Sequence, residues 1–289
     1  MHGNIHEAIL GWYDVHQRDL PWRRPEAGPW SVMVSEFMLQ QTPVARVLPV
    51  HEAWLTRWPT PASLAAEPSG EAVRAWGRLG YPRRALRLHA AAGVIVERHG
   101  GEVPAEYDDL IGLPGVGDYT AAAIASFGFG RRHVVLDTNV RRVFARLLAG
   151  EELPAPSVTR AERELAASVL PGEETAAVWS VAVMELGALV CTATAPSCAD
   201  CPVVAECAWY SAGRPAYAGP ERKAQTWAGT DRQCRGRLLA VLRDADGPVH
   251  KRRLDLVWDK VEQRERALAG LLTDGLAVQV GPQTYALPG

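Results

Sequence analysis

The sequence predicts an all-α main domain, and two observations lead to this prediction. Residues 5–207 read as successive amphipathic or apolar segments of helical length, which Pro and Gly separate. No sustained alternation of apolar and polar residues, the pattern of a half-buried strand, interrupts them. The 289 residues, 47% of them hydrophobic, suffice for one or two globular cores. We therefore expect a helical domain over residues 1–212.

A different pattern follows this domain. Residues 213–228 are poor in aliphatic side chains and rich in Pro, Gly and charge, which predicts a linker. Residues 229–289 then contain three short helical segments, at 235–244, 250–259 and 262–275, and two short strands, at 277–280 and 284–287. This order is typical of a small winged-helix-like domain, a module that either binds DNA or serves in packing and dimerisation.

The total charge does not mark a nucleic-acid-binding protein. The net charge is -2, whereas such proteins often carry a strongly basic total. One short span nevertheless concentrates basic residues, which form either a phosphate-binding surface or an ordinary solvated face. They are Arg131, Arg132, His133, Arg141, Arg142 and Arg146. No apolar run approaches the roughly 20 residues of a membrane span, and no secretory signal is evident, so we expect a cytoplasmic protein, nucleoid-associated in a bacterium.

A glycine-containing turn separates two predicted helices, at residues 107–113 and 119–127. The turn has the sequence Pro-Gly-Val-Gly, which contains Gly115, Val116 and Gly117 and directly follows Leu113. The two glycines let the turn reach positive φ, and we expect the turn amides and the next helix N-terminus to hold a DNA phosphate. An ordinary αα-hairpin without a bound phosphate has the same sequence pattern, so this alternative interpretation stays open.

Four of the five cysteines lie close together in the sequence. Cys191, Cys198, Cys201 and Cys207 have the spacing C-x6-C-x2-C-x5-C, and Cys234 stands alone. In a cytosolic chain this clustering favours a metal over disulfide bonds. Four thiolates suit either zinc or an iron-sulfur cluster.

Several motifs together resemble the helix-hairpin-helix DNA glycosylase superfamily, and specifically the MutY adenine glycosylases. They are LPGVGDYTAAAI, LDTNVRRV, SEFMLQQT and the cysteine spacing, and the likeness covers about residues 20–207. It implies a helix-hairpin-helix glycosylase fold with a [4Fe-4S] cluster on the four cysteines. It further implies base excision repair of adenine mispaired with 8-oxoguanine or guanine in double-stranded DNA. We expect a monomer without a membrane partner.

The resemblance assigns the catalytic roles to residues of these motifs. Glu36 protonates the departing adenine, and the apolar segment around it favours the protonated form of its carboxyl group. Asp137 supports the positive charge that develops on the sugar, as a carboxylate does in glycoside hydrolysis. Asn139 belongs to the same motif. The sequence alone reads Asp137 as the N-cap of a helix that begins near Asn139, where backbone amides keep it ionised.

Tyr119 distinguishes this chain from endonuclease III-like relatives. In those proteins a lysine at this place attacks the sugar and forms a Schiff base. A phenol cannot form that imine, so we expect a monofunctional glycosylase that uses water as the final nucleophile.

The resemblance also implies a set of base contacts. Gln41 and Tyr81 wedge into the base stack, and Thr42 and Leu79 touch the base opposite adenine. Extrusion of a base costs a few kcal/mol, which such wedges offset. The pocket for the extruded adenine is lined by Trp22, Arg23 and Leu39, and Gln40 belongs to the same LQQT motif.

Two departures from the family pattern stand out. Ser180 and Val181 replace an Asn-Glu or Asn-Gln pair that contacts adenine in relatives, which puts adenine selectivity in question. The roughly 60 C-terminal residues are too few for the Nudix-like domain that typically recognises 8-oxoguanine. Three alternatives therefore stay open: a thymine or uracil mismatch glycosylase, a bifunctional lyase, and a non-enzymatic iron-sulfur DNA-binding regulator.

Overall fold

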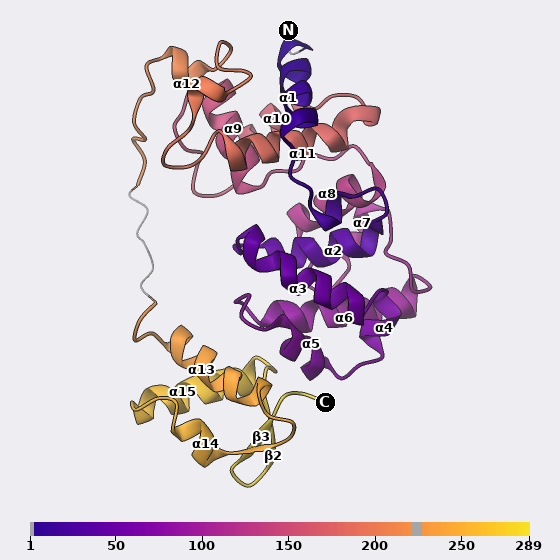
Figure 1. Ribbon diagram of the computed structural model, residues 1–289, viewed down its shortest axis with the longest axis vertical. Coiled ribbons are helices and arrows are strands. Elements are labelled where there is room, and N and C mark those ends of the chain that lie inside the picture. The colour runs from indigo at the N-terminus through magenta and orange to yellow at the C-terminus, as the bar shows by residue number, and fades with distance from the viewer. Residues whose placement is uncertain (1–2, 221–226) are drawn as a thin grey trace. The chain divides into compact units, whose positions relative to one another are not determined.

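The computed structural model describes residues 3–220 and 227–289 and is mainly helical (Figure 1). The all-α prediction for the main domain is confirmed, because residues 3–220 contain no strand. Backbone contacts divide the chain into two compact units. Unit 1 comprises Met1–Met33, Ala105–Ile111 and Val116–Glu221, and unit 2 comprises Val34–Pro104, Gly112–Gly115 and Arg222–Gly289. The helices of the described ranges are each too short or too polar to cross a membrane.

Unit 1 is built around the long helix α11. Its elements are α1 (Gly3–His16), η1 (Pro21–Arg23), α7 (Tyr107–Ile111), α8 (Asp118–Phe129), α9 (Thr138–Phe144), the π-helix η2 (Ala145–Ala149), α10 (Arg160–Val169), α11 (Glu173–Leu189), η3 (Cys198–Asp200) and α12 (Ala208–Ser211). Helices α1, α8 and α9 pack against α11, and α12 packs against η2 (Figure 1). Apolar residues of α1, α9 and α11 form one core, and Cys191, Cys201 and Cys207 pack against it. The cysteine loop is therefore supported by the same core that fixes α9.

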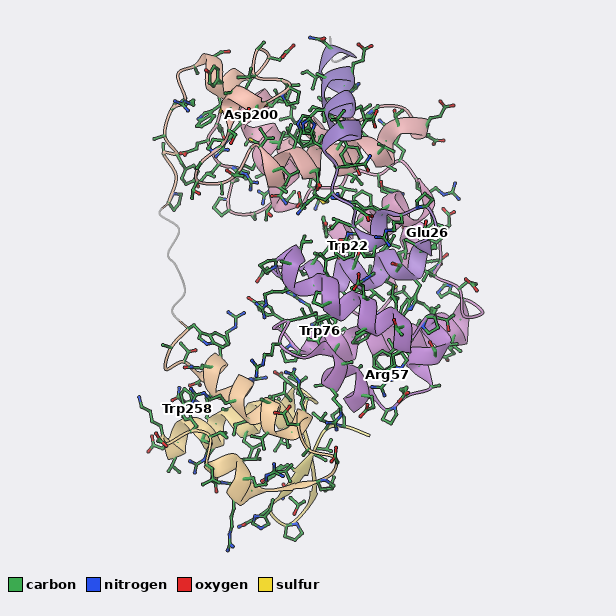
Figure 2. The ribbon with its side chains drawn as sticks, in the orientation of Figure 1. Trp22, Glu26, Arg57, Trp76, Asp200 and Trp258 are labelled. Atoms are coloured by element: carbon green, nitrogen blue, oxygen red, sulfur yellow. The ribbon has the colours of Figure 1, made fainter. Side chains whose placement is uncertain are left out.

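Helix α2 (Gly28–Leu39) is divided between the two units, and unit 2 begins within it. The helices that follow are α3 (Val44–Arg57), α4 (Pro61–Ala65), α5 (Ser69–Trp76) and α6 (Arg83–Arg98). Trp54 lies edge-on to both Trp58 and Trp76, with ring centroids 4.7 and 5.8 Å apart, and all three are buried (Trp76 is labelled in Figure 2). Such pairs add to the stabilisation that burial of large rings supplies. This tryptophan cluster holds α3 against α5.

The C-terminal segment has the three helices and the hairpin that the sequence predicts. They are α13 (Asp231–Arg243), α14 (Lys251–Asp255), α15 (Val261–Thr273), β2 (Val278–Gly281) and β3 (Thr284–Ala286). A further strand, β1 (Val249–His250), pairs with β3, so the sheet has the antiparallel order β1-β3-β2. Residues 221–226 of the predicted linker lie outside the described residues. The predicted domain boundaries at 212 and 228 stay predictions.

The predicted hairpin forms between α7 and α8, but its two glycines differ. Gly115 has φ +83°, and an added Cβ would lie 2.7 Å from Arg87 Cβ and 3.1 Å from Phe37 Cε1. The turn therefore needs glycine at this position for both its conformation and its close packing. Gly117, by contrast, is the extended N-cap of α8 with φ -110°. Helix N-caps adopt extended backbone, which most residues tolerate.

Candidate active site

Asp137 caps α9, as the sequence predicts. Its Oδ1 accepts a hydrogen bond of 2.6 Å from the Val140 amide, and its Oδ2 accepts one of 2.8 Å from Asn139 Nδ2. Asn139 in turn accepts a hydrogen bond from Arg142 Nη2 at 2.8 Å. Gly187 of α11 leaves the room for this arrangement, because an added Cβ would lie 2.8 Å from Asn139 Cβ. The motif thus fixes one carboxylate orientation through side-chain and backbone donors.

The carboxyl group of Asp137 has a raised pKa. Burial raises it, and the hydrogen bonds from Val140 and Asn139 and the charge of Arg142 oppose this effect without cancelling it. The expectation that capping alone keeps the group ionised is therefore too simple. A carboxylate in such a place interacts strongly with a cation, because little water screens its charge.

Neither alternative for the basic span, a phosphate-binding surface or a solvated face, describes Arg142 and Arg146. Both are buried, with 9% and 1% of their surface exposed. Arg142 donates to the carbonyl oxygens of Cys191 at 2.7 Å and Gly187 at 2.6 Å. Arg146 donates to the Thr192 carbonyl at 2.7 Å and approaches Cys191 Sγ at 3.4 Å. These two guanidinium groups hold the cysteine loop on α9 and η2, so they are not presented to solvent.

The other members of that basic span have protein partners. Arg141 is ion-paired to Glu162 at 2.9 Å, and Arg131 to Glu106 at 3.1 Å. Arg132 donates to the carbonyls of Leu170 and Pro171, and His133 stacks on Tyr107. A sequence cluster of positive charge is therefore distributed among separate local contacts.

The four clustered cysteines are half-buried and share one neighbourhood. Burial raises the pKa of Cys201 to about 11, and the other three cysteines act on it electrostatically. Among residues 3–220 and 227–289, no three His, Cys, Asp or Glu side chains form a group that could hold a metal ion as it stands. Four neighbouring thiols nevertheless fit the donor set of an iron-sulfur cluster in kind and number. The cysteine loop (residues 191–207) also contains Asp200, labelled in Figure 2.

An ion-pair cluster in unit 1 was not foreseen from the sequence. Glu185 of α11 is fully buried, and its two oxygens accept hydrogen bonds of 2.7 Å from Arg18 Nε and Nη2. Arg23 Nη2 lies 2.9 Å from the same carboxylate. Burial alone would raise the pKa of Glu185, but these arginines outweigh it and lower the pKa to about 2. Arg18 and Glu185 are 167 positions apart in the sequence, so no local pattern predicts the pair.

Arg23, predicted to line the adenine pocket, has one free donor. Its Nη1 is buried and has no hydrogen-bond partner among the described residues, whereas Nη2 is held by Glu185. A buried donor without a partner is unfavourable unless a ligand supplies one. Trp22 precedes Arg23 in η1 and is buried. Ser180, at the place of the missing family pair, donates its hydroxyl to the Ala176 carbonyl at 2.9 Å within α11.

Glu36 lies in α2, where Ser31 to Met38 are all buried, and 6% of its own surface is exposed. Glu36 belongs to unit 2 and Asp137 to unit 1. Tyr119 is half-buried in the first turn of α8 and packs against the small core of Ala122, Ala123 and Val135. The predicted burial of Glu36 among apolar residues is thus observed.

Unit 2 brings together several of the predicted base contacts. Thr42 is buried, and its hydroxyl donates to the Leu79 carbonyl at 3.2 Å. Its amide donates to the Leu39 carbonyl at 3.1 Å. Arg84 donates to the Gln40 carbonyl, and the neighbouring Gln41 is exposed at φ +54°. The segment after α2 and the loop before α6 are therefore joined by hydrogen bonds.

Residues 34–168 match the family model of the HhH-GPD superfamily of base excision DNA repair proteins. Over 283 residues, which are 97% of this chain and 92% of the relative, the sequence is 52% identical to the adenine DNA glycosylase of Mycobacterium tuberculosis. This chain belongs to the adenine DNA glycosylase family. The human member is 40% identical over 213 residues, which are 69% of this chain and 38% of that protein.

The family relationship extends to the fold and, in part, to the C-terminal segment. The solved structure of a thermostable thymine-DNA glycosylase matches with a TM-score of 0.65 and 27% identity, over 72% of this chain and 95% of that one. The mycobacterial match covers 97% of this chain and 92% of the relative, so it includes most of the C-terminal segment. As a member of a DNA repair family, the chain has DNA as a partner.

Proposed function

We propose that this chain hydrolyses the N-glycosidic bond of adenine mispaired with 8-oxoguanine or guanine in duplex DNA. The observation that carries the proposal is the 52% identity to an adenine DNA glycosylase over 97% of the chain. The buried Glu36 and the capping carboxylate of Asp137 support it, because they supply an acid and an anion. The monomeric state and the cytoplasmic location stay predictions.

In the proposed mechanism the two carboxyl groups act on opposite charges. Glu36 gives its proton to the departing adenine, and the electron pair of the broken glycosidic bond leaves with the base. Asp137, as the carboxylate, stabilises the positive charge that then develops on the sugar. Water adds to the sugar carbon and returns its proton to Glu36, which restores the starting state.

The product of this reaction is an abasic site with an intact strand. Tyr119 stands where a lysine would form a Schiff base, and its hydroxyl cannot make that bond. We therefore propose a monofunctional enzyme. Borohydride reduction during turnover tests this assignment, since a covalent adduct of the chain with DNA would contradict it.

Adenine recognition is proposed to rest on Arg23. Its buried Nη1 lacks a partner among the described residues and can donate to a ring nitrogen of the extruded base. Glu185 fixes the other side of the guanidinium group. This contact compensates in part for Ser180 and Val181, which provide no side-chain amide or carboxylate to the base.

The four cysteines Cys191, Cys198, Cys201 and Cys207 are proposed to hold a [4Fe-4S] cluster. When bound, the cluster supplies structural order to the loop rather than a chemical step. Arg142 and Arg146 hydrogen-bond the carbonyls of Cys191 and Thr192. The same Arg142 donates to Asn139, so the loop and the Asp137 cap share a donor.

Single-turnover base release tests the proposed function. Duplexes carry A opposite 8-oxoguanine, A opposite G, T opposite G or U opposite G. We expect adenine release by the wild type and about a 100- to 10,000-fold slower reaction for Glu36→Gln, with DNA affinity retained. Glu26→Gln, a change of an exposed glutamate labelled in Figure 2, is the control. Release of thymine or uracil alone would refute the adenine assignment, and full activity of Glu36→Gln would refute the acid.

A further inference from the structure

The loop between α5 and α6 presents Tyr81 in an unusual conformation. Tyr81 has φ +47° and follows Gly80 at φ +89°, so two successive residues lie in the left-handed region. Only a few per cent of non-glycine residues adopt such a φ, and a bulky side chain there requires support from its surroundings. Tyr81 is 39% exposed. The residues that pack on the Tyr81 ring therefore help to hold this conformation.

Two arginines from different parts of unit 2 lie over the Tyr81 ring. The guanidinium carbon of Arg84 in α6 is 4.5 Å from the ring centroid, and that of Arg232 in α13 is 4.3 Å from it. Both distances are within the range of cation-π attraction. Burial, together with the charges of Arg87 and Arg232, lowers the pKa of Arg84, which agrees with two positive groups sharing this place. Arg232 thus links the C-terminal segment to the loop.

Further contacts dock the C-terminal segment on α5 and α6. Arg243 donates to the Val73 carbonyl at 3.0 Å, and Arg74 donates to the Ala245 carbonyl at 3.0 Å. Asp274 pairs with Arg83 at 3.2 Å. Burial lowers the pKa of Arg243 to about 10, as expected for a guanidinium group enclosed by this contact.

Gly70 shows how closely the chain end approaches α5. Its amide donates to the Pro288 carbonyl at 2.8 Å, and an added Cβ would lie 2.8 Å from Leu287 Cβ. Any side chain at position 70 would push the last residues away. These contacts dock the end of the chain on α5 without involving Arg232.

We propose that Arg232 is a positioning residue for Tyr81, and that the C-terminal segment thereby takes part in selecting the mispair. This inference rests on the proposed function and on the expectation, from the family resemblance, that Tyr81 enters the base stack. A ring held in one orientation loses less conformational freedom on insertion than a ring that rotates freely. A positive group behind the ring also favours the approach of the phosphate backbone. The fixed orientation of the ring distinguishes mispaired from paired DNA, because only a weakened base pair lets the Tyr81 ring enter the base stack.

The test compares Arg232→Met with Arg232→Lys and a control. Methionine keeps an unbranched apolar stem and removes the guanidinium group with its charge, whereas lysine retains a cation for the ring. Arg237→Met is the matched control, because Arg237 lies on the same helix and over Trp258 at 5.3 Å, within the C-terminal segment (Trp258 is labelled in Figure 2). Every variant also carries Glu36→Gln, so that binding is measured before any base is released.

The measurement is the dissociation constant for duplexes with A opposite 8-oxoguanine and for fully paired duplexes of the same sequence, at one salt concentration. We expect Arg232→Met to lower the ratio of the two affinities about 3- to 10-fold. Arg232→Lys should restore most of the ratio, and Arg237→Met should leave it unchanged. Equal weakening on both duplexes would mean that Arg232 only neutralises phosphate, and an unchanged ratio would mean that it has no role; either result overturns the proposal.

A second measurement needs no DNA. In a double-mutant cycle of urea unfolding with Arg232→Met and Tyr81→Leu, contact between the two side chains predicts a non-zero coupling, whereas additive effects would overturn it. If the wild type releases no adenine but this coupling is present, the proposed function fails and the contact stands. If adenine is released and the coupling is absent, the proposed function stands and the positioning role fails.

Discussion

The Asp137 region and the Tyr81 loop achieve rigidity in opposite ways. Asp137 is half-buried and held by the Val140 amide and by Asn139, which Arg142 holds in turn. Tyr81 is 39% exposed, lies at positive φ and has two arginines over its ring in cation-π contacts. Hydrogen bonds in a low dielectric fix both distance and angle, whereas a cation over a ring tolerates sliding.

The difference matches the demands of the proposed reaction. A carboxylate that faces a short-lived cation must already be in place when charge develops, because its reorganisation would add to the barrier. A residue that enters a base stack must instead adapt to DNA of varying geometry. We therefore expect substitutions in the Asp137 region to alter stability and rate, and substitutions at the Tyr81 loop to alter selectivity.

Loss of a cysteine should have the largest effect on the Asp137 region. Cys198→Ser removes one proposed cluster ligand, and metal binding is linked to the folding of the loop that supplies the ligands. We expect loss of the iron-sulfur absorbance, faster proteolysis within the cysteine loop and at least about a 10-fold loss of DNA affinity. Cys234→Ser, a change outside the cluster, is the control. A variant that binds and reacts normally would show that the loop needs no cluster for its structure.

Glu185→Gln should have the next largest effect. Removal of one partner from a buried ion pair typically costs about 3 to 5 kcal/mol, and here Arg18 and Arg23 would both lose their carboxylate. Because the pKa of Glu185 is lowered to about 2, its contribution is present above the ordinary value of 4.5 and is lost as pH falls toward 2. Urea unfolding at pH 7 and pH 3 measures the free energy of unfolding and so tests both the size of this loss and its pH dependence.

The pH dependence of the unfolding free energy separates a loss of the Glu185 charge from a simple packing defect. The gap in unfolding free energy between wild type and Glu185→Gln should narrow as the pH falls below 4.5. Glu206→Gln, at an exposed position, should leave the free energy within about 0.5 kcal/mol at either pH. A gap that is the same at both pH values would indicate that the charge of Glu185 does not stabilise the fold.

These residues also show what the sequence could and could not predict. The cap at Asp137, the hairpin at Gly115 and the helices of the C-terminal segment were predicted because local spacing and turn chemistry determine them. The partners of Arg142 and Arg146 were not, because carbonyl groups 45 to 49 residues away leave no signature in side-chain pattern. A run of arginines therefore resembled a phosphate-binding surface, although two of its members are buried in the protein.

The residues predicted to contact the bases show the same limit, because the sequence does not reveal their long-range partners. Motif resemblance named Thr42, Leu79 and Tyr81, and the hydrogen bond from Thr42 to Leu79 joins two of them. The contact of Arg232 with Tyr81 was not predicted, because a side chain 151 positions further along the sequence carries no local indication of its partner. Long-range contacts depend on how helices pack against one another. The hydrophobic periodicity of one helix shows which face is buried but not which helix covers it.

Asn139→Ala should have the smallest effect, and it tests the electrostatics of the Asp137 region. Burial already raises the pKa of Asp137, so some of the protein carries a protonated Asp137 at pH values where an ordinary aspartate is ionised. Only the carboxylate stabilises a cation, so the single-turnover rate should fall as the pH drops through this raised pKa. The Asn139 hydrogen bond lowers the pKa, and its removal should move the acidic limb of the rate profile to higher pH.

The plateau of the rate profile separates a change in the pKa of Asp137 from a change in its orientation. If Asn139 acts mainly on the charge of Asp137, Asn139→Ala should shift the acidic limb and slow the plateau rate by about 10-fold or less, the value of one hydrogen bond. Asn4→Ala, which removes an exposed contact with Glu206, should change neither. A slower plateau with an unmoved limb would mean that Asn139 aligns Asp137 without altering its ionisation, and the rigidity of this region would then be geometric rather than electrostatic.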